Sequence, residues 1–163
     1  DSGVSTNSIY TRFGDKSGLF SAVVKSAADG LMEIYLGSIS EASVRGSANT
    51  AIDMGGDGTE QVLKYIYDNL DAFRLILCNS AGTEYEDYFD RLAETEEKFY
   101  REFVRKYAKE PQKISDFFIH VVCRTRWQYV FEVVSHDIPY EEAQGFMKSI
   151  REYSFAGWKR VME

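Results

Sequence analysis

Residues 113–135 have the sequence KISDFFIHVVCRTRWQYVFEVVS, the most apolar stretch of the chain. Its apolar side chains fall on more than one face of a helix, and a helix that is apolar most of the way round is buried on two sides. A short turn at 136–139 ends in Pro139 and leads into a second stretch with helical periodicity, residues 140–162. Two long helices joined by so short a turn pack antiparallel, and their excess apolar surface requires a partner.

The preceding segments also have helical patterns. No Gly or Pro lies between Thr83 and Pro111, so residues 83–109 are predicted to form one helix. Its first half is rich in acidic residues and its last turns in basic ones, which complements the helix dipole, and ion pairs such as Glu97–Arg101 are spaced i, i+4. Residues 15–40 are predicted to form a long helix with Asp15 as its N-cap. The glycines at 55, 56 and 58 indicate a loop, followed by shorter helices at 59–70 and 70–78. Strand signals are weak, so the predicted fold is all-α.

Composition limits the class of protein. The 163 residues include 26 acidic against 19 basic side chains, for a net charge of −7, and 44% are hydrophobic, as in ordinary globular proteins. Cys78 and Cys123 are too few for a disulfide framework and suit a reducing cytosol. Since no signal peptide or apolar run of about 20 residues occurs, we expect a cytoplasmic protein without a membrane partner. The acidic balance argues against broad binding to nucleic acid, but a small DNA-reading patch remains compatible with it.

A different pattern occupies residues 3–20, GVSTNSIYTRFGDKSGLF. Gly3 suits a tight turn, and Ser5 is a good N-cap for a short helix. Ile9 and Phe13 are spaced i, i+4 and face inward, while the outward side chains are short hydrogen-bonding groups, one phenol and one guanidinium. Such a surface suits base edges and phosphates in a major groove. A turn followed by a short helix is the second half of a helix-turn-helix.

The joint spacing of the Gly-Val-Ser turn, Tyr10, Phe13, Lys16 and the Leu-Phe pair at 19–20 resembles the C-terminal half of the TetR-family DNA-binding domain. The resemblance covers about residues 3–25. It implies that 1–25 are the end of a helix-turn-helix domain and that 26–163 form a helical ligand-binding and dimerisation domain. It implies DNA contacts from Ser5, Thr6, Asn7, Ser8, Tyr10, Thr11, Arg12 and Lys16. Because the family's earlier helices have no counterpart here, we expect a fragment that alone binds operator DNA poorly.

Aromatic residues are abundant in the middle of the chain, where each is an ordinary core residue or part of a ligand cavity. His120, Arg124 and Trp127 lie on one helical stripe, and arginine is almost never buried without a partner. Arg124 therefore pairs with a carboxylate, forms a bond across a dimer interface, or binds a ligand. Arg126 and Gln128 lie on other faces of the helix and are candidates for the dimer interface instead. The candidate ligand-binding residues are Phe73, Phe89, Phe99, Phe103, Phe117, His120, Arg124 and Trp127.

Catalysis has little support in the sequence. His120 and Cys123 are spaced i, i+3, but two ligands do not make a metal site. No phosphate-binding loop, nucleophile elbow or paired-histidine zinc motif occurs, so we expect neither an enzyme nor a bound metal or cofactor.

The expected function is a ligand-responsive transcription regulator, a repressor that a small molecule releases from double-stranded operator DNA. The expected dimer forms through the last two helices. The alternative is a helical interaction or carrier protein that no longer binds DNA.

Overall fold

The structure is a computed structural model that describes residues 11–44 and 48–163, with the side chains of 11–40 and 58–163. Within these ranges the chain is helical and contains no strand, which confirms the all-α prediction. The elements are α2 (Lys16–Val44), α3 (Ala48–Asp68), α4 (Leu70–Asn79), α5 (Tyr88–Tyr107), the 3₁₀ helix η1 (Pro111–Lys113), α6 (Asp116–Ser135) and α7 (Tyr140–Met162).

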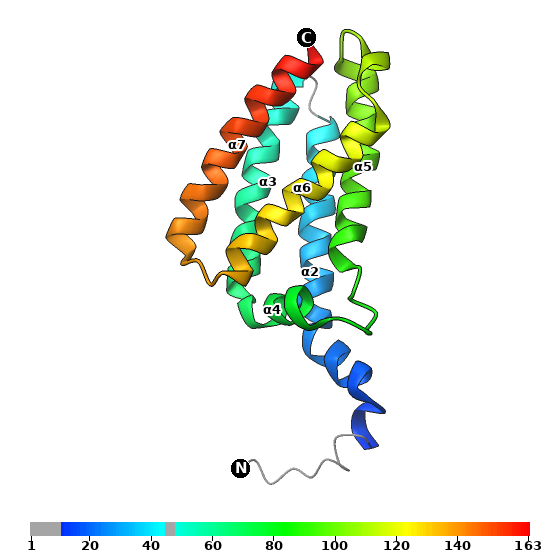
Figure 1. Cartoon of the computed structure of the whole chain (residues 1–163), viewed down its shortest axis with the longest axis vertical. Coiled ribbons are helices and arrows are strands. Elements are labelled where there is room, and N and C mark those ends of the chain that lie inside the picture. Colours follow the sequence, from blue (N-terminus) through cyan, green and yellow to red (C-terminus); the bar gives the residue numbers. More distant parts are fainter. Residues whose placement is uncertain (1–10, 45–47) are drawn as a thin grey trace.

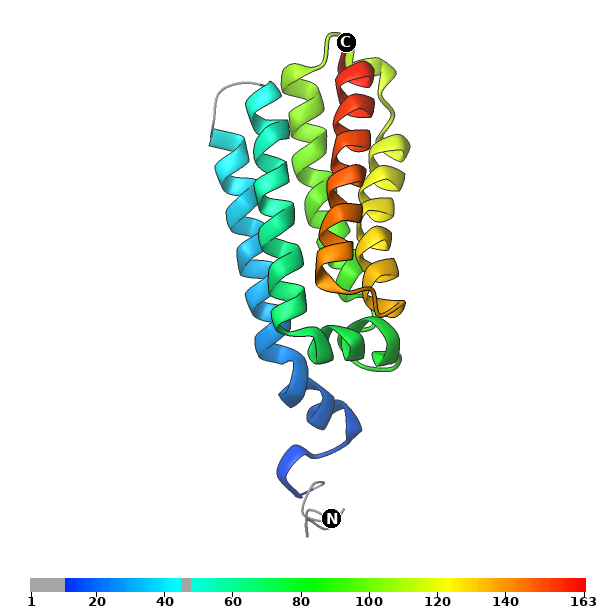
Figure 2. The same ribbon diagram turned by 90° about the vertical axis from the view of Figure 1, so that its left-hand side faces the viewer.

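The long helices form an elongated bundle, and the short α4 lies across one end of it (Figure 1). α2 packs against α3, α5 packs against α6, and α7 packs against α3. The first turns of α2 extend past α4 and beyond the bundle, in both views (Figures 1 and 2). The N-terminal end of the described chain is therefore set apart from the packed core.

Asp15 starts α2, as predicted. Its Oδ1 accepts a hydrogen bond of 2.8 Å from the backbone N–H of Gly18, which satisfies one of the free donors at the helix N-terminus. Just before it, Gly14 has a φ of 78°, a left-handed conformation that glycine adopts without steric cost. Residues 11–13 are helical, so Gly14 and Asp15 form the sharp connection between one helical segment and the next.

The predicted loop at 55–58 is wrong, because these residues belong to α3, which begins at Ala48. Gly58 has a specific packing role there: a Cβ at this position would lie 2.9 Å from Cβ of Ser38 on α2. The glycine thus allows α2 and α3 to approach closely instead of breaking the helix. Asn69 ends α3, where its side-chain amide donates to the carbonyl of Tyr65 at 3.0 Å.

α5 begins at Tyr88 instead of near residue 83, because residues 80–87 form successive turns. The N–H groups of Thr83, Glu86 and Tyr88 each bond to a carbonyl three residues earlier. Two buried tyrosines hold these turns against α2, and the hydroxyl of Tyr88 donates to the carbonyl of Ala28 at 2.6 Å. Tertiary contacts to α2 therefore override the helical pattern of this segment.

α6 and α7 run in opposite directions, as predicted, and α6 crosses the bundle obliquely (Figure 1). Aromatic side chains join the two helices: the ring centroids of Tyr129 and Phe146 are 6.1 Å apart, and those of Phe118 and Trp158 are 5.7 Å apart. The connecting turn contains Asp137 at a φ of 54°, and its carboxylate lies 2.5 Å from the guanidinium of Arg74 on α4.

Candidate functional site

The part of the predicted DNA-reading segment that the structure describes is exposed. Thr11, Arg12 and Lys16 all face solvent at the tip beyond the bundle, and the guanidinium of Arg12 lies 5.5 Å from the ring centroid of Phe13. Lys16 is the first residue of α2, next to the partial positive charge of the helix N-terminus, where anions are stabilised. The other proposed contacts, Ser5, Thr6, Asn7, Ser8 and Tyr10, lie outside the described residues.

A cavity of about 90 Å³, partly open to solvent, lies in the bundle between α2, α3, α5, α6 and α7. Its wall is mainly apolar and aromatic, with a few polar groups, which is the usual composition of a small-molecule site. The lining side chains and glycine are Tyr35, Ser38, Ile39, Gly58, Thr59, Val62, Glu96, Phe99, Tyr100, Arg126, Trp127, Val130 and Met147.

An ion pair lies in this wall. Glu96 on α5 is only 2% exposed, and its Oε1 is 2.7 Å from Nη1 of Arg126 on α6. The same guanidinium donates to the hydroxyl of Tyr100 at 3.0 Å and to Oγ1 of Thr59 at 3.3 Å. Arg126 thus joins three helices at the cavity and is well supplied with acceptors.

Burial dominates the electrostatics of the pair. It raises the pKa of Glu96 above the ordinary value, and Arg126 is the strongest of the groups that oppose this shift. The pKa of Tyr35 is also raised, by burial and then by the negative charge of Glu96. At neutral pH Tyr35 therefore keeps its proton and is available as a hydrogen-bond donor.

Three polar atoms in the wall make no hydrogen bond within the described part of the chain: Oη of Tyr35, Oε2 of Glu96 and Nε1 of Trp127. Their side chains are 8%, 2% and 7% exposed, respectively. Tyr35 and Trp127 both lie close enough to the Glu96 carboxylate to act on it as hydrogen-bond donors and lower its pKa, although none of the three atoms makes a contact with full hydrogen-bond geometry among the described residues. Because a buried polar atom without a partner costs about 1–3 kcal/mol, three in one wall are an unusual concentration.

A second cavity of about 60 Å³ adjoins the first, between α7 and the rest of the bundle. The two share Thr59, Tyr100, Arg126 and Met147, so the guanidinium of Arg126 lies where they meet. Phe155 and Trp158 add aromatic side chains to the wall of the second cavity.

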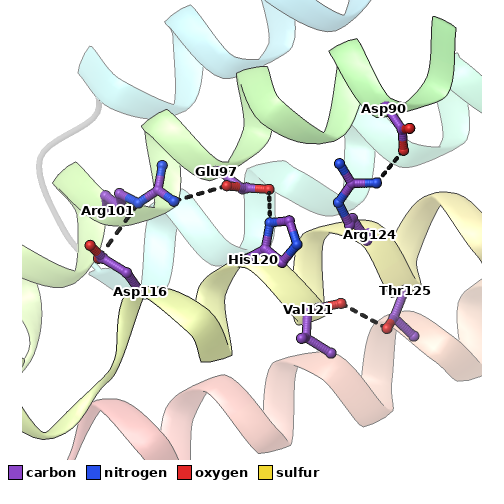
Figure 3. Close-up of polar contacts among 8 residues, drawn as sticks. All are labelled: Asp90, Glu97, Arg101, Asp116, His120, Val121, Arg124 and Thr125. Carbon is purple, nitrogen blue, oxygen red and sulfur yellow. Dashed lines mark hydrogen bonds and ion pairs between the residues drawn. The ribbon is translucent and has the colours of Figure 1, made fainter. Parts of the chain in front are cut away.

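His120 and Arg124, two of the proposed ligand-binding residues, do not line the larger cavity; both pair with carboxylates on α5 (Figure 3). Nδ1 of His120 is 2.8 Å from Oε1 of Glu97, which also binds Arg101 at 2.9 Å. Arg124 forms an ion pair with Asp90. Of the three alternatives for Arg124, the structure shows the carboxylate partner.

The six aromatic candidates are in different places. Phe99 and Trp127 line the cavity, whereas Phe73 is fully buried in the main core and Phe103 in a smaller core near the C-terminal end. Phe89 lies with Arg124 and Trp127 in a separate surface hollow of about 280 Å³. Phe117 is 74% exposed on α6.

Sequence reasoning missed the ion pair at the cavity. Glu96 belongs to an acidic run that looks like a solvated face, and Arg126 was assigned to the dimer as its alternative role. A usable signal was present: Glu96 is spaced with Leu92, Phe99 and Phe103 on the apolar stripe of α5. Arg126 is likewise spaced with Ile119 and Val130 on α6, so a carboxylate and a guanidinium interrupt two facing apolar stripes.

None of the described helices combines the length and apolar character needed to cross a bilayer. Searches found no family model, no curated protein and no solved structure that matches the chain. The class defined by fold and site is accordingly an all-α helical bundle with a mixed polar and apolar cavity and a projecting N-terminal segment.

Proposed function

We propose that the chain belongs to a cytoplasmic, TetR-like transcription regulator, a repressor that a small molecule releases from its operator. The observation that carries the proposal is the continuity of α2. This helix begins at Lys16, in the segment whose motif resembles a DNA reader, and contains Tyr35 in the cavity wall. At 1.5 Å per residue the two positions are about 28 Å apart along one helix. A displacement of α2 at the cavity therefore also moves its exposed N-terminal end.

The proposed mechanism is allosteric. A molecule in the cavity favours one position of α2, and in a dimer this changes the separation of the two reading segments. Helix-turn-helix dimers require these segments about 34 Å apart, one turn of DNA. Linkage then requires that operator DNA weaken binding of the molecule by the same factor by which the molecule weakens binding of DNA.

The proposed dimer uses the outer faces of α6 and α7. Phe117 on α6 and Tyr153 on α7 are 74% and 72% exposed, and exposed apolar side chains that form a contiguous patch mark an interaction site. Phe146, Tyr153 and Val161 are spaced along one stripe of α7, and each is at least 38% exposed. A second copy packed on this stripe would remove these side chains from water.

DNA binding is the test. The protein, expressed from the start codon of its gene, is incubated with a library of random DNA duplexes, and selected sequences are measured by mobility shift. We expect a site with two half-sites about one helical turn apart and one dimer per site. Affinity no greater than that for unselected DNA would contradict the proposal.

Lys16→Ala gives a sharper version of the test. If Lys16 contacts a phosphate, its removal weakens binding to all sequences and reduces the slope of log affinity against log salt by about one. The matched control is Lys25→Ala, also on α2, where Lys25 pairs with Asp29 at 2.8 Å. Equal slopes for both variants would exclude Lys16 from the interface.

The alternative is a helical carrier protein that binds a small molecule but not DNA. The buried polar atoms of the cavity favour it as much as they favour a regulator, since both need a ligand site. Saturable binding of a small molecule, combined with no DNA selectivity, would select the carrier.

A further inference from the structure

We propose that the cavity between α2, α5 and α6 binds an uncharged small molecule of about one ring that bears a hydroxyl group, a phenol or a cyclic alcohol. The unpartnered atoms of Tyr35, Glu96 and Trp127 are the groups that would bind this hydroxyl. The proposal names the effector class of the regulator described above and rests on that function for its regulatory consequence. The binding chemistry itself depends only on the cavity.

The ion pair disfavours an ionic group in the larger cavity, while Arg151 lines the adjoining one. Glu96 and Arg126 are the only charged side chains among the described residues that line the larger cavity, and they neutralise each other at 2.7 Å. A carboxylate ligand would have to displace Glu96 from Arg126, while an ammonium ligand would compete with Arg126 for Glu96. Either exchange leaves one buried charge without its partner, which is costly in a low-dielectric site.

The hydrogen-bonding groups of the wall select a hydroxyl. The Tyr35 O–H and the Trp127 N–H are donors, while Oε2 of ionised Glu96 is an acceptor only. A ligand hydroxyl donates one hydrogen bond and accepts others, so one group satisfies Glu96 and one or both donors. An ether or ketone only accepts and would leave Oε2 unpartnered.

Size limits the rest of the molecule. The two adjoining cavities measure about 90 Å³ and 60 Å³. Because a cavity of about 150 Å³ holds one benzene ring, a molecule bound to the polar atoms of the 90 Å³ cavity can have no more than one ring, part of which lies in the cavity's opening to solvent. Other lining side chains, including Phe99, Val130 and Met147, are apolar and suit a hydrocarbon ring.

Calorimetric titration of the full chain with four single-ring probes tests the proposal: phenol, benzene, benzoate and benzylamine. Phenol and benzene differ by the hydroxyl alone, while the other two carry opposite charges at neutral pH. We expect phenol to bind about tenfold more tightly than benzene, the ratio given by about 1.4 kcal/mol of hydrogen bonding. Benzoate and benzylamine should both bind more weakly than phenol.

Tyr35→Phe removes one hydroxyl from the wall and keeps the ring. It should weaken phenol binding about fivefold and leave benzene binding unchanged. The matched control is Tyr67→Phe, which removes a hydroxyl that donates to the carbonyl of Ile138 at 2.7 Å, away from the cavity. That control should leave both affinities unchanged.

Three results would overturn the proposal: equal affinity for phenol and benzene, tighter binding of either charged probe, or no saturable binding of phenol. Equal affinity would mean that the three polar atoms bond to one another when a ligand enters. The regulator is tested separately, by repeating the mobility shift with phenol. Selective phenol binding without any effect on DNA would support the cavity chemistry and contradict the regulatory function. Specific DNA binding without phenol binding would support the regulatory function and contradict the proposed cavity chemistry.

Discussion

Arg126→Met should give the protein a pH-dependent loss of stability that arises from a single buried carboxyl group. Burial already raises the pKa of Glu96 above its ordinary value of 4.5, and Arg126 is the main influence against that rise. In the variant the carboxyl loses the cation 2.7 Å away, so its pKa rises further. The folded state then holds a proton that the unfolded state releases.

The size of the effect follows from the geometry. Two unit charges separated by the observed 2.7 Å interact by about 6 kcal/mol at an effective dielectric constant of about 20. The side chain of Arg126 is 29% exposed, so solvent weakens this attraction. Removing one member of a buried pair costs about 3–5 kcal/mol, and we expect a loss at the lower end of that range at neutral pH.

Proton linkage gives the direction in which the stability of the variant changes with pH. Where the pKa is higher in the folded state than in the unfolded state, the folded state binds more protons, and stability falls as pH rises. Relative to the natural protein, the extra loss in the Arg126→Met variant therefore begins at the natural folded-state pKa of Glu96, which lies above the ordinary value of 4.5, and grows up to the higher folded-state pKa of the variant. One titrating group limits the slope to about 1.4 kcal/mol per pH unit.

Urea unfolding of the natural protein and the variant at several pH values between about 5 and about 8 measures this difference. The control compares Glu96→Gln with the double variant Glu96→Gln/Arg126→Met; neither protein contains the titrating group, so the difference between them should be independent of pH. A difference that is constant with pH in the single variant, or that keeps its slope in the double variant, would refute the reasoning.

Three further substitutions test other parts of the structure. Tyr153→Lys should shift the sedimentation coefficient from dimer towards monomer, whereas Val23→Lys, at a 55% exposed position on α2, should not; an unchanged dimer would place the interface elsewhere. Asp15→Ala should lower the free energy of unfolding by about 1 kcal/mol, because it removes the N-cap of α2, and an unchanged value in urea would exclude that role. Leu31→Ala, at a fully buried position, should cost about 2–5 kcal/mol in the same assay, and a smaller loss would mean that the core closes around the cavity left behind.

The sequence predicted the helices whose signals are local. The cap at Asp15, the proline that begins η1 and the turn before α7 all lie at or near the expected positions. The first turns of α3 were missed because glycine usually indicates a loop, while Gly58 is instead required by the close approach of Ser38. The start of α5 was misplaced because contacts of Tyr85 and Tyr88 with other parts of the fold decide it.

The candidate site was only partly predictable, because helical periodicity shows which residues share a face but not which face opens on a cavity. His120 and Arg124 share a helical stripe with Trp127. Each of them nevertheless pairs with a carboxylate on α5 instead of lining the cavity. Arg126, two residues later, faces the opposite direction into the cavity and meets Glu96. The orientation of α6 against α5 decides between these two arginines, and that orientation depends on the whole bundle.

The uninterrupted course of α2 has a consequence for protein engineering. The residue boundary between the proposed reading domain and the sensing domain falls inside this helix, between residues 25 and 26, with no linker. Inserting one residue there would rotate the exposed tip by about 100° about the helix axis relative to the bundle, and inserting seven would nearly restore the original direction about 10 Å further out. A chimaera with another reading domain must therefore conserve helical phase across this boundary.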